Sequence, residues 1–157
     1  AMNNLIEWLP KNIPSDDATS IVHGDFRLDN MIYKNNEVIG VLDWELSTLG
    51  HPVADFSYHC LTWRTEPIFY DHPKLKELGV PNEIEYRDMY SESTGQDLSE
   101  NWEYYMAFNI FKVAAICQGI LGRVRDGTAA NKHAEDRGMK VYPLSEGAWS
   151  IVENNFK

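Results

Sequence analysis

The sequence His23-Gly24-Asp25-Phe26-Arg27-Leu28-Asp29-Asn30 leads directly into two short apolar runs, residues 31–34 and 37–42. Asn35-Asn36 separates the two runs. Two apolar runs around an Asn-rich turn are typical of a β-hairpin. We therefore predict a hairpin immediately after the polar loop, and this prediction fixes how the polar side chains around it are arranged.

The hairpin brings polar side chains together from both of its ends. Because a hairpin folds back on itself, the start of its first strand lies beside the end of its second strand. Asn30 precedes the first strand and Asp43 follows the second, so we expect them to be neighbours. Asp25 lies in the loop that enters the same corner.

The segments around the hairpin favour helices. Apolar residues recur at helical spacing over most of the remaining chain, and proline or glycine residues stand at several segment ends. The sequence predicts a helix end at residues 5–9, a strand at 19–22, and helices at 53–63, 83–93, 99–125 and 130–156, the last one kinked or split by Pro143. We expect a long irregular connection at residues 65–81. The predicted fold class is α+β and mostly helical.

The composition limits the classes of partner. The 157 residues include 14 basic and 24 acidic side chains, a formal net charge of −10. Such a chain is repelled by nucleic acid and by anionic lipid surfaces. We also find no run of the roughly 20 consecutive apolar residues that a membrane span requires. We therefore expect neither a nucleic-acid partner nor a membrane partner.

The two cysteines indicate a reducing environment. Cys60 and Cys117 lie in apolar runs, 57 positions apart, without a metal-binding or disulfide pattern. We predict two buried thiols, because free cysteine behaves as a small apolar residue. A cytoplasmic location fits this use of cysteine.

The polar corner has the composition of a magnesium site. Carboxylate and amide oxygens suit Mg²⁺, which commonly takes one or two protein ligands together with substrate phosphates. The third group, a further carboxylate, could orient a hydroxyl and accept its proton. These are the parts that phosphoryl transfer requires.

Three motifs resemble one enzyme family. The loop at residues 23–30 resembles the catalytic loop of the aminoglycoside phosphotransferase and choline kinase superfamily, residues 41–45 resemble its metal-binding segment, and residues 50–56 resemble its G-x-P-x-x-D segment. The key residues follow Asp25 by 5, 18 and 30 positions. Residues 23–60 are most similar to the kinase-like domain fused to some acyl-CoA dehydrogenases and to its free-standing bacterial relatives, and residues 102–122 are similar to it too. The resemblance covers essentially the whole chain.

The resemblance assigns a role to each polar residue of the corner. It implies that Asp25 is the catalytic base and that Asn30 and Asp43 are the metal ligands. It also implies that His23 and Asp55 support the loop, Asp55 through backbone N–H groups. Glu45 and Arg27 are candidates for supporting roles near the metal and the phosphate, although Arg27 could instead pair with Asp29 or Glu45.

The implied fold is the C-terminal lobe of a protein-kinase-like fold, with a small β-hairpin next to the catalytic loop. An ATP-covering N-terminal lobe needs roughly 70 residues, whereas 22 residues precede His23 and no G-x-G-x-x-G pattern occurs. We therefore expect residues 1–157 to form a single C-lobe without the nucleotide-binding lobe. An exposed apolar face on such a lobe would favour self-association.

The resemblance implies an ATP- and Mg²⁺-dependent phosphotransferase that acts on a hydroxyl of a small molecule. We expect a hydroxyacyl compound or a similar metabolite ahead of an aminoglycoside, and we expect the isolated chain to be inactive. The first alternative is a non-catalytic pseudo-kinase module that binds a partner or ligand. A second alternative, a two-metal hydrolase, would need more His or Asp ligands than the sequence spaces for it.

Overall fold

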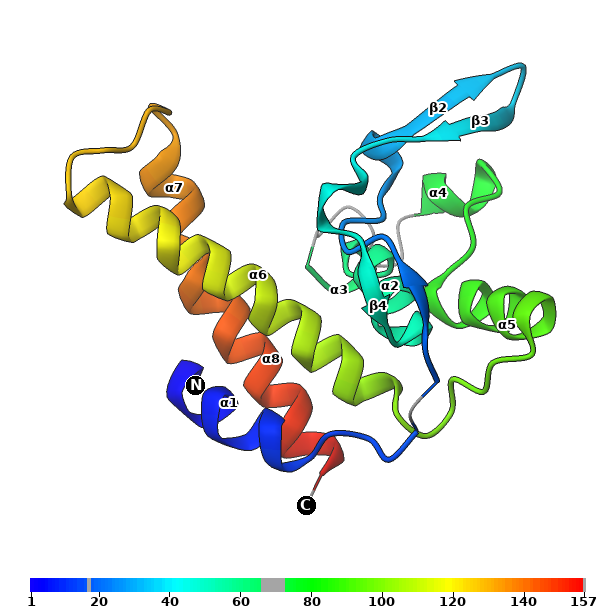
Figure 1. Cartoon of the computed structure of the whole chain (residues 1–157), viewed down its shortest axis with the longest axis horizontal. Coiled ribbons are helices and arrows are strands. Elements are labelled where there is room, and N and C mark those ends of the chain that lie inside the picture. The colour runs from blue at the N-terminus through cyan, green and yellow to red at the C-terminus, as the bar shows by residue number, and fades with distance from the viewer. Residues whose placement is uncertain (17, 66–72, 157) are drawn as a thin grey trace. The chain divides into compact units, whose positions relative to one another are not determined.

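A computed structural model describes residues 1–16, 18–65 and 73–156, and Figure 1 shows the order of the elements along the chain. The chain divides into two compact units, Ala1–Pro14 with Glu103–Lys157, and Ser15–Trp102. Helices predominate and the strands are short. The predicted mostly helical α+β class is therefore confirmed.

The unit Ser15–Trp102 carries all the strands that the structure describes. Its strands are β1 (Ser20–Val22), β2 (Met31–Lys34), β3 (Glu37–Val41) and β4 (Thr48–Gly50). Its helices are α2 (Pro52–His59), α3 (Thr62–Thr65), α4 (Pro73–Glu77) and α5 (Glu83–Thr94), and α5 ends at Gly95 as the sequence suggests. Two 3₁₀ turns, Leu28–Asn30 and Trp44–Leu46, flank the hairpin.

The predicted hairpin is present. Strands β2 and β3 pair antiparallel, with Met31 opposite Val41 and Lys34 opposite Glu37. The turn residues Asn35 and Asn36 both have positive φ, 52° and 62°. Asn tolerates this left-handed conformation, and it is what a two-residue hairpin turn requires. The turn chemistry sets the pairing next to the turn, and a one-residue shift in register between Ile32 and Tyr33 gives the pairing at the far end, where Met31 lies opposite Val41.

Strand β4 is an element that the sequence pattern does not reveal. It pairs antiparallel with β1, with Ser20 opposite Gly50 and Val22 opposite Thr48. A strand of three residues is too short to produce a periodic signal. The pairing nevertheless matters, because the chain leaves β4 and enters α2 beside the loop that leaves β1.

Several predicted boundaries change in the structure. The predicted helix at 53–63 is divided into α2 and α3 around Cys60. The predicted irregular connection at 65–81 contains α4, while residues 66–72 of that prediction lie outside the described residues. The long helix α6 (Trp102–Arg125) begins three residues later than predicted.

The other unit is built from α1 (Met2–Trp8), α6 beyond its first residue, α7 (Ala134–Met139) and α8 (Val141–Asn155). The predicted break in residues 130–156 is confirmed, and it falls at Lys140. Pro143 occupies the first turn of α8, where its missing N–H has no intrahelical partner to lose. Ala114, Cys117 and Val141 form a buried cluster between α6 and α8, and Met2 of α1 packs against it.

Both cysteines are buried, as predicted. Burial in apolar surroundings raises the pKa of the Cys60 thiol and that of the Cys117 thiol. Both thiols therefore stay protonated and poorly reactive at neutral pH.

Among the residues that the structure describes, one helix meets the length and composition of a membrane span. Helix α6 has 24 residues and is apolar enough to cross a bilayer by these two criteria alone. This helix contains no run of 20 consecutive apolar residues, but the mean hydropathy of an 18-residue stretch within it meets the limit. The criterion is also met by the core helices of soluble proteins, and α6 buries Trp102, Met106, Ala107 and Ile110.

Candidate active site

The backbone of the polar loop is held by a carboxylate from the first turn of α2. Asp55 Oδ2 accepts the N–H of His23 at 2.7 Å, and its Oδ1 accepts the N–H of Gly24 at 2.8 Å. Helix α2 starts favourably here, because the His51 side chain accepts the N–H of Val53 and Pro52 stands at the first helical position. These are the backbone contacts that the resemblance implies for Asp55.

His23 joins the loop to the end of the hairpin. Its Nδ1 accepts the N–H of Asp25 at 3.2 Å, and its Nε2 lies 2.7 Å from the carbonyl oxygen of Leu42. A carbonyl only accepts, so Nε2 carries the proton. The side chain is 2% exposed and its ring lies 4.7 Å from that of Trp44. With both ring nitrogens engaged, this histidine anchors the loop and has no free nitrogen to act as a base.

The Asp25 carboxylate is held at both oxygens. Oδ1 accepts the hydroxyl of Tyr58 at 2.8 Å, and Oδ2 accepts the amide of Asn30 at 3.1 Å. The Nε atom of Arg27 lies 3.4 Å from Oδ2, and the Asp25 side chain is 19% exposed. A carboxylate with one ion pair, two hydrogen bonds and partial access to solvent is fixed in orientation and can still be reached by a substrate.

Asn30 and Asp43 lie at the same end of the hairpin. The Asn30 amide nitrogen donates to the backbone oxygen and the carboxylate of Asp25, so its Oδ1 remains the accepting side of the amide. The Leu42 N–H donates to the backbone oxygen of Asn30 at 2.8 Å, and Asp43 follows directly with a left-handed φ of 65°. The structure thus brings together the residues that the hairpin argument brings together.

The donor set at this corner fits a magnesium ion. Asn30 supplies an amide oxygen and the exposed Asp43 supplies a carboxylate. Among the described residues, no three His, Cys, Asp or Glu side chains form a group that could hold a metal by themselves. Two protein oxygen donors nonetheless suit Mg²⁺, which retains water and takes the rest of its ligands from substrate phosphates.

The two supporting candidates differ in their contacts. Arg27 pairs with Asp25 and, at 3.8 Å, with Asp29, while its side chain remains 54% exposed. The sequence offered Asp29 and Glu45 as alternative partners of Arg27, and Arg27 pairs with Asp29. Glu45 lies in the 3₁₀ turn that follows Asp43 and its side chain is exposed.

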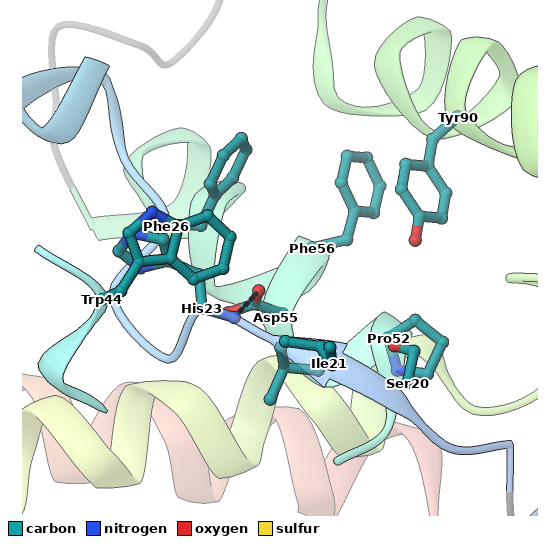
Figure 2. A pocket seen from close by; sticks show the side chains of 10 residues that line it. Ser20, Ile21, His23, Phe26, Trp44, Pro52, Asp55, Phe56 and Tyr90 are labelled. Carbon is teal, nitrogen blue, oxygen red and sulfur yellow. Dashed lines mark hydrogen bonds between the residues drawn. The ribbon is translucent and has the colours of Figure 1, made fainter. Parts of the chain in front are cut away.

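A pocket of about 260 Å³ lies beside the loop and is distinct from the polar corner. Figure 2 shows Asp55 next to His23, with the rings of Trp44 and Phe26 nearby and those of Phe56 and Tyr90 on the other side. Asp25, Asn30 and Asp43 do not line this pocket. Asp55 and His23 form their hydrogen bonds with the loop, and most of the other residues that line the pocket are apolar. The pocket therefore lies under the loop as part of its support.

Tyr58 is a site residue that sequence reasoning missed. It lies on α2, three positions after Asp55, and residues at this spacing share one helix face. That spacing is the signal that could have placed both side chains under the loop. Burial and the hydrogen bond to Asp25 raise the pKa of Tyr58 to about 12, so its hydroxyl remains a donor at neutral pH.

Comparisons with known proteins give one family model and several relatives of known name. The family model described as "Phosphotransferase enzyme family" matches residues 1–100. The chain is 43% identical over 159 residues to mouse acyl-CoA dehydrogenase family member 10, covering 97% of this chain and 15% of that protein. It is 36% identical over 163 residues to human acyl-CoA dehydrogenase family member 11, covering 99% of this chain and 21% of that protein.

A solved structure gives the same result for the fold. A crystal structure from Ralstonia eutropha, provisionally called an aminoglycoside phosphotransferase, matches with a TM-score of 0.90 and 44% sequence identity. The match covers 99% of this chain and 50% of that one. The chain thus spans about half of this structural relative and about a fifth or less of the curated relatives named above.

The matched family covers the loop, the hairpin and helix α2, which are the segments that build the polar corner. The likeness of the solved structure extends over nearly the whole chain. The predicted kinase-like fold is thereby confirmed, and the chain belongs to the phosphotransferase enzyme family.

Proposed function

We propose that this chain is the catalytic and acceptor-binding part of an ATP-dependent phosphotransferase that phosphorylates a hydroxyl of a small molecule. The observation that supports the proposal is the arrangement around Asp25. Its carboxylate is fixed at both oxygens, in a loop whose backbone is held by Asp55. Asn30 and Asp43 lie at the same end of the hairpin, where the Leu42 N–H donates to the backbone oxygen of Asn30.

Asp25 is the proposed catalytic base. Its carboxylate would accept a hydrogen bond from the acceptor hydroxyl, hold the oxygen in line with the phosphoryl group, and take the proton as the new O–P bond forms. Phosphoryl transfer depends mainly on positioning and on charge stabilisation. A carboxylate with restricted rotation is suited to the first of these tasks.

Asn30 Oδ1 and the Asp43 carboxylate are the proposed holders of Mg²⁺. When bound, the ion would supply positive charge to the phosphate oxygens during transfer. The amide of Asn30 has a second task in the structure, because its nitrogen donates to Asp25. This residue would therefore connect the metal ligand set to the proposed base.

Arg27 and Glu45 are proposed to act next to this centre. The half-exposed guanidinium of Arg27 could leave Asp25 and Asp29 to meet a phosphate, since Arg binds phosphate oxygens in a fork-like geometry. Glu45 follows Asp43 closely enough in sequence to contribute a further carboxylate near the metal.

A hydroxyacyl compound is the acceptor class that we favour. Two relatives that match almost the whole chain carry the name of acyl-CoA dehydrogenase family members. The structural relative's name points instead to an aminoglycoside, and the net charge of −10 would suit a polycation. Identity does not separate the two classes, because the structural relative is 44% identical and the two curated relatives are 36% and 43% identical to this chain over nearly its whole length. We place the acyl class first because both of the curated relatives named above carry that name.

The test is ATP turnover by a protein that contains these 157 residues together with the preceding part of its natural reading frame. Acceptors are a panel of hydroxyacyl-CoAs, choline and kanamycin, each with and without Mg²⁺. We expect turnover with a hydroxyacyl-CoA, dependence on Mg²⁺, and little turnover by the 157-residue chain alone.

The Asp25→Asn variant tests the base. General-base catalysis contributes about 10²- to 10⁴-fold, so kcat should fall by at least about 100-fold while nucleotide binding persists. An Asp88→Asn variant is the control, because Asp88 lies exposed on α5. Full activity of Asp25→Asn would show that Asp25 is not the base. If the wild type turns over no acceptor but binds a ligand or partner, the non-catalytic module is favoured instead.

A further inference from the structure

The Asp25 carboxylate is coordinated by three side chains, two of them from its own loop. Asn30 and Arg27 both face Oδ2, whereas the contact to Oδ1 comes from the Tyr58 hydroxyl on α2. Rotation of the carboxylate about its last bond would exchange Oδ1 and Oδ2. A donor at Oδ1 from a different element therefore fixes the plane of the group, which the loop donors by themselves would leave free to swing.

Helix α2 has a firm position relative to the loop. Asp55, one turn before Tyr58 on the same helix, binds the two N–H groups that precede Asp25 in the loop. The backbone and the side chain of the loop are thus held by one rigid element. A supporting side chain that lies on a helix is placed more precisely than one that lies on a loop.

The contact also directs where an incoming hydroxyl can bind. A carboxylate offers about four lone-pair positions, two on each oxygen. Oδ2 faces two donors among the described residues and Oδ1 faces one. The less occupied oxygen is the one that Tyr58 holds, so an acceptor hydroxyl would dock on Oδ1 next to the Tyr58 hydroxyl.

We propose that Tyr58 is a positioning residue that fixes the Asp25 carboxylate for phosphoryl transfer and presents its Oδ1 to the acceptor hydroxyl. This proposal rests on the proposed function. Tyr58 stays protonated at neutral pH, so it donates its hydrogen bond throughout the working range. It exchanges no proton with the substrate and acts through Asp25 alone.

The test is steady-state kinetics of Tyr58→Phe in the protein that includes the nucleotide-binding part. The variant removes one oxygen and retains the ring. Misplacement of a catalytic group by about 1 Å can cost about 100-fold, so we expect kcat to fall about 10- to 100-fold. KM for ATP and KM for the acceptor should each stay within about twofold.

A double-mutant cycle separates positioning from general support of the fold. In an Asp25→Asn background, Tyr58→Phe should change kcat by less than about twofold, because the group that it positions no longer acts as a base. A merely structural role would lower kcat by the same factor in both backgrounds. The matched control is Tyr86→Phe, since Tyr86 is a partly buried tyrosine on α5 that packs against Trp63.

The outcomes distinguish this proposal from the proposed function. Wild-type turnover with an unchanged kcat in Tyr58→Phe would overturn the role of Tyr58 and leave the function intact. Absence of wild-type turnover would overturn both. If Tyr58→Phe does not fold, Tyr58→His retains an aromatic ring with a shorter reach, and it should also lose kcat at constant KM; full kcat in that variant overturns the proposal.

Discussion

The contact between Asp55 and the loop backbone supplies the sharpest stability prediction. Its two hydrogen bonds, at 2.7 and 2.8 Å, join a carboxylate to the N–H groups of His23 and Gly24. A hydrogen bond to a charged group contributes about 1.5–3 kcal/mol. Loss of both bonds in Asp55→Ala should therefore lower the free energy of unfolding by about 3–6 kcal/mol, a large share of the 5–15 kcal/mol typical of a domain.

The Asp55→Asn variant makes the prediction more specific. Its amide oxygen can still accept one N–H, but its NH₂ group then faces the other N–H, donor against donor. One buried donor without a partner costs about 1–3 kcal/mol, and the remaining bond loses its charge assistance. We expect Asp55→Asn to lose about 2–4 kcal/mol, although it is nearly isosteric with the wild type.

The assay is urea unfolding followed by tryptophan fluorescence. Trp44 lies 4.7 Å from the ring of His23 and reports on the loop. The control is Asp88→Asn on the exposed face of α5, which should change the free energy of unfolding by less than about 0.5 kcal/mol. If Asp55→Asn loses no more than this control, the carboxylate does not support the loop and the reasoning is wrong.

Two further predictions test the loop and the fold of the same unit. Gly24 has φ +84°, and a Cβ there would lie 2.6 Å from the backbone oxygen of Leu46, whereas Gly95 has φ +72° with open space around it. Gly24→Ala should therefore lower the free energy of unfolding by clearly more than the roughly 1–2 kcal/mol expected for Gly95→Ala. Equal losses of the two variants in urea unfolding would contradict the predicted clash. Burial favours a raised pKa for Glu83, but its hydrogen bonds and ion pair with Arg64, and its bond from Trp102, outweigh burial and hold the pKa below its usual 4.5. The depressed pKa stabilises the fold above pH 4.5, and this stabilisation is lost as pH falls through the pKa of Glu83 in the folded state. The difference in free energy of unfolding between the wild type and Glu83→Gln should therefore shrink below pH 4.5 in a pH series of urea titrations. A constant difference down to about pH 3 would refute this prediction.

The sequence predicts the site residues better than it predicts their connections. The hairpin follows from local chemistry, because two asparagines adopt the left-handed turn that joins two apolar runs. That single element is enough to bring Asn30 beside Asp43, as expected. The end of α5 at Gly95 and the start of α8 close to Pro143 are also local, since they depend on φ preferences and on a missing donor.

The contacts that hold the site come from residues distant in sequence. The Asp55 carboxylate reaches the loop across 31 and 32 positions, and Tyr58 reaches Asp25 across 33. Their placement depends on the pairing of β4 with β1; the sequence predicts β1, but the three residues of β4 carry no periodic signal. The sequence by itself thus determined which polar residues cluster and which chemistry suits them. The family resemblance also implied that Asp55 holds the backbone of the loop. Only the tertiary structure decided that Tyr58 of the same helix holds the carboxylate of Asp25, because a hydrogen bond across 33 positions leaves no local pattern in the sequence.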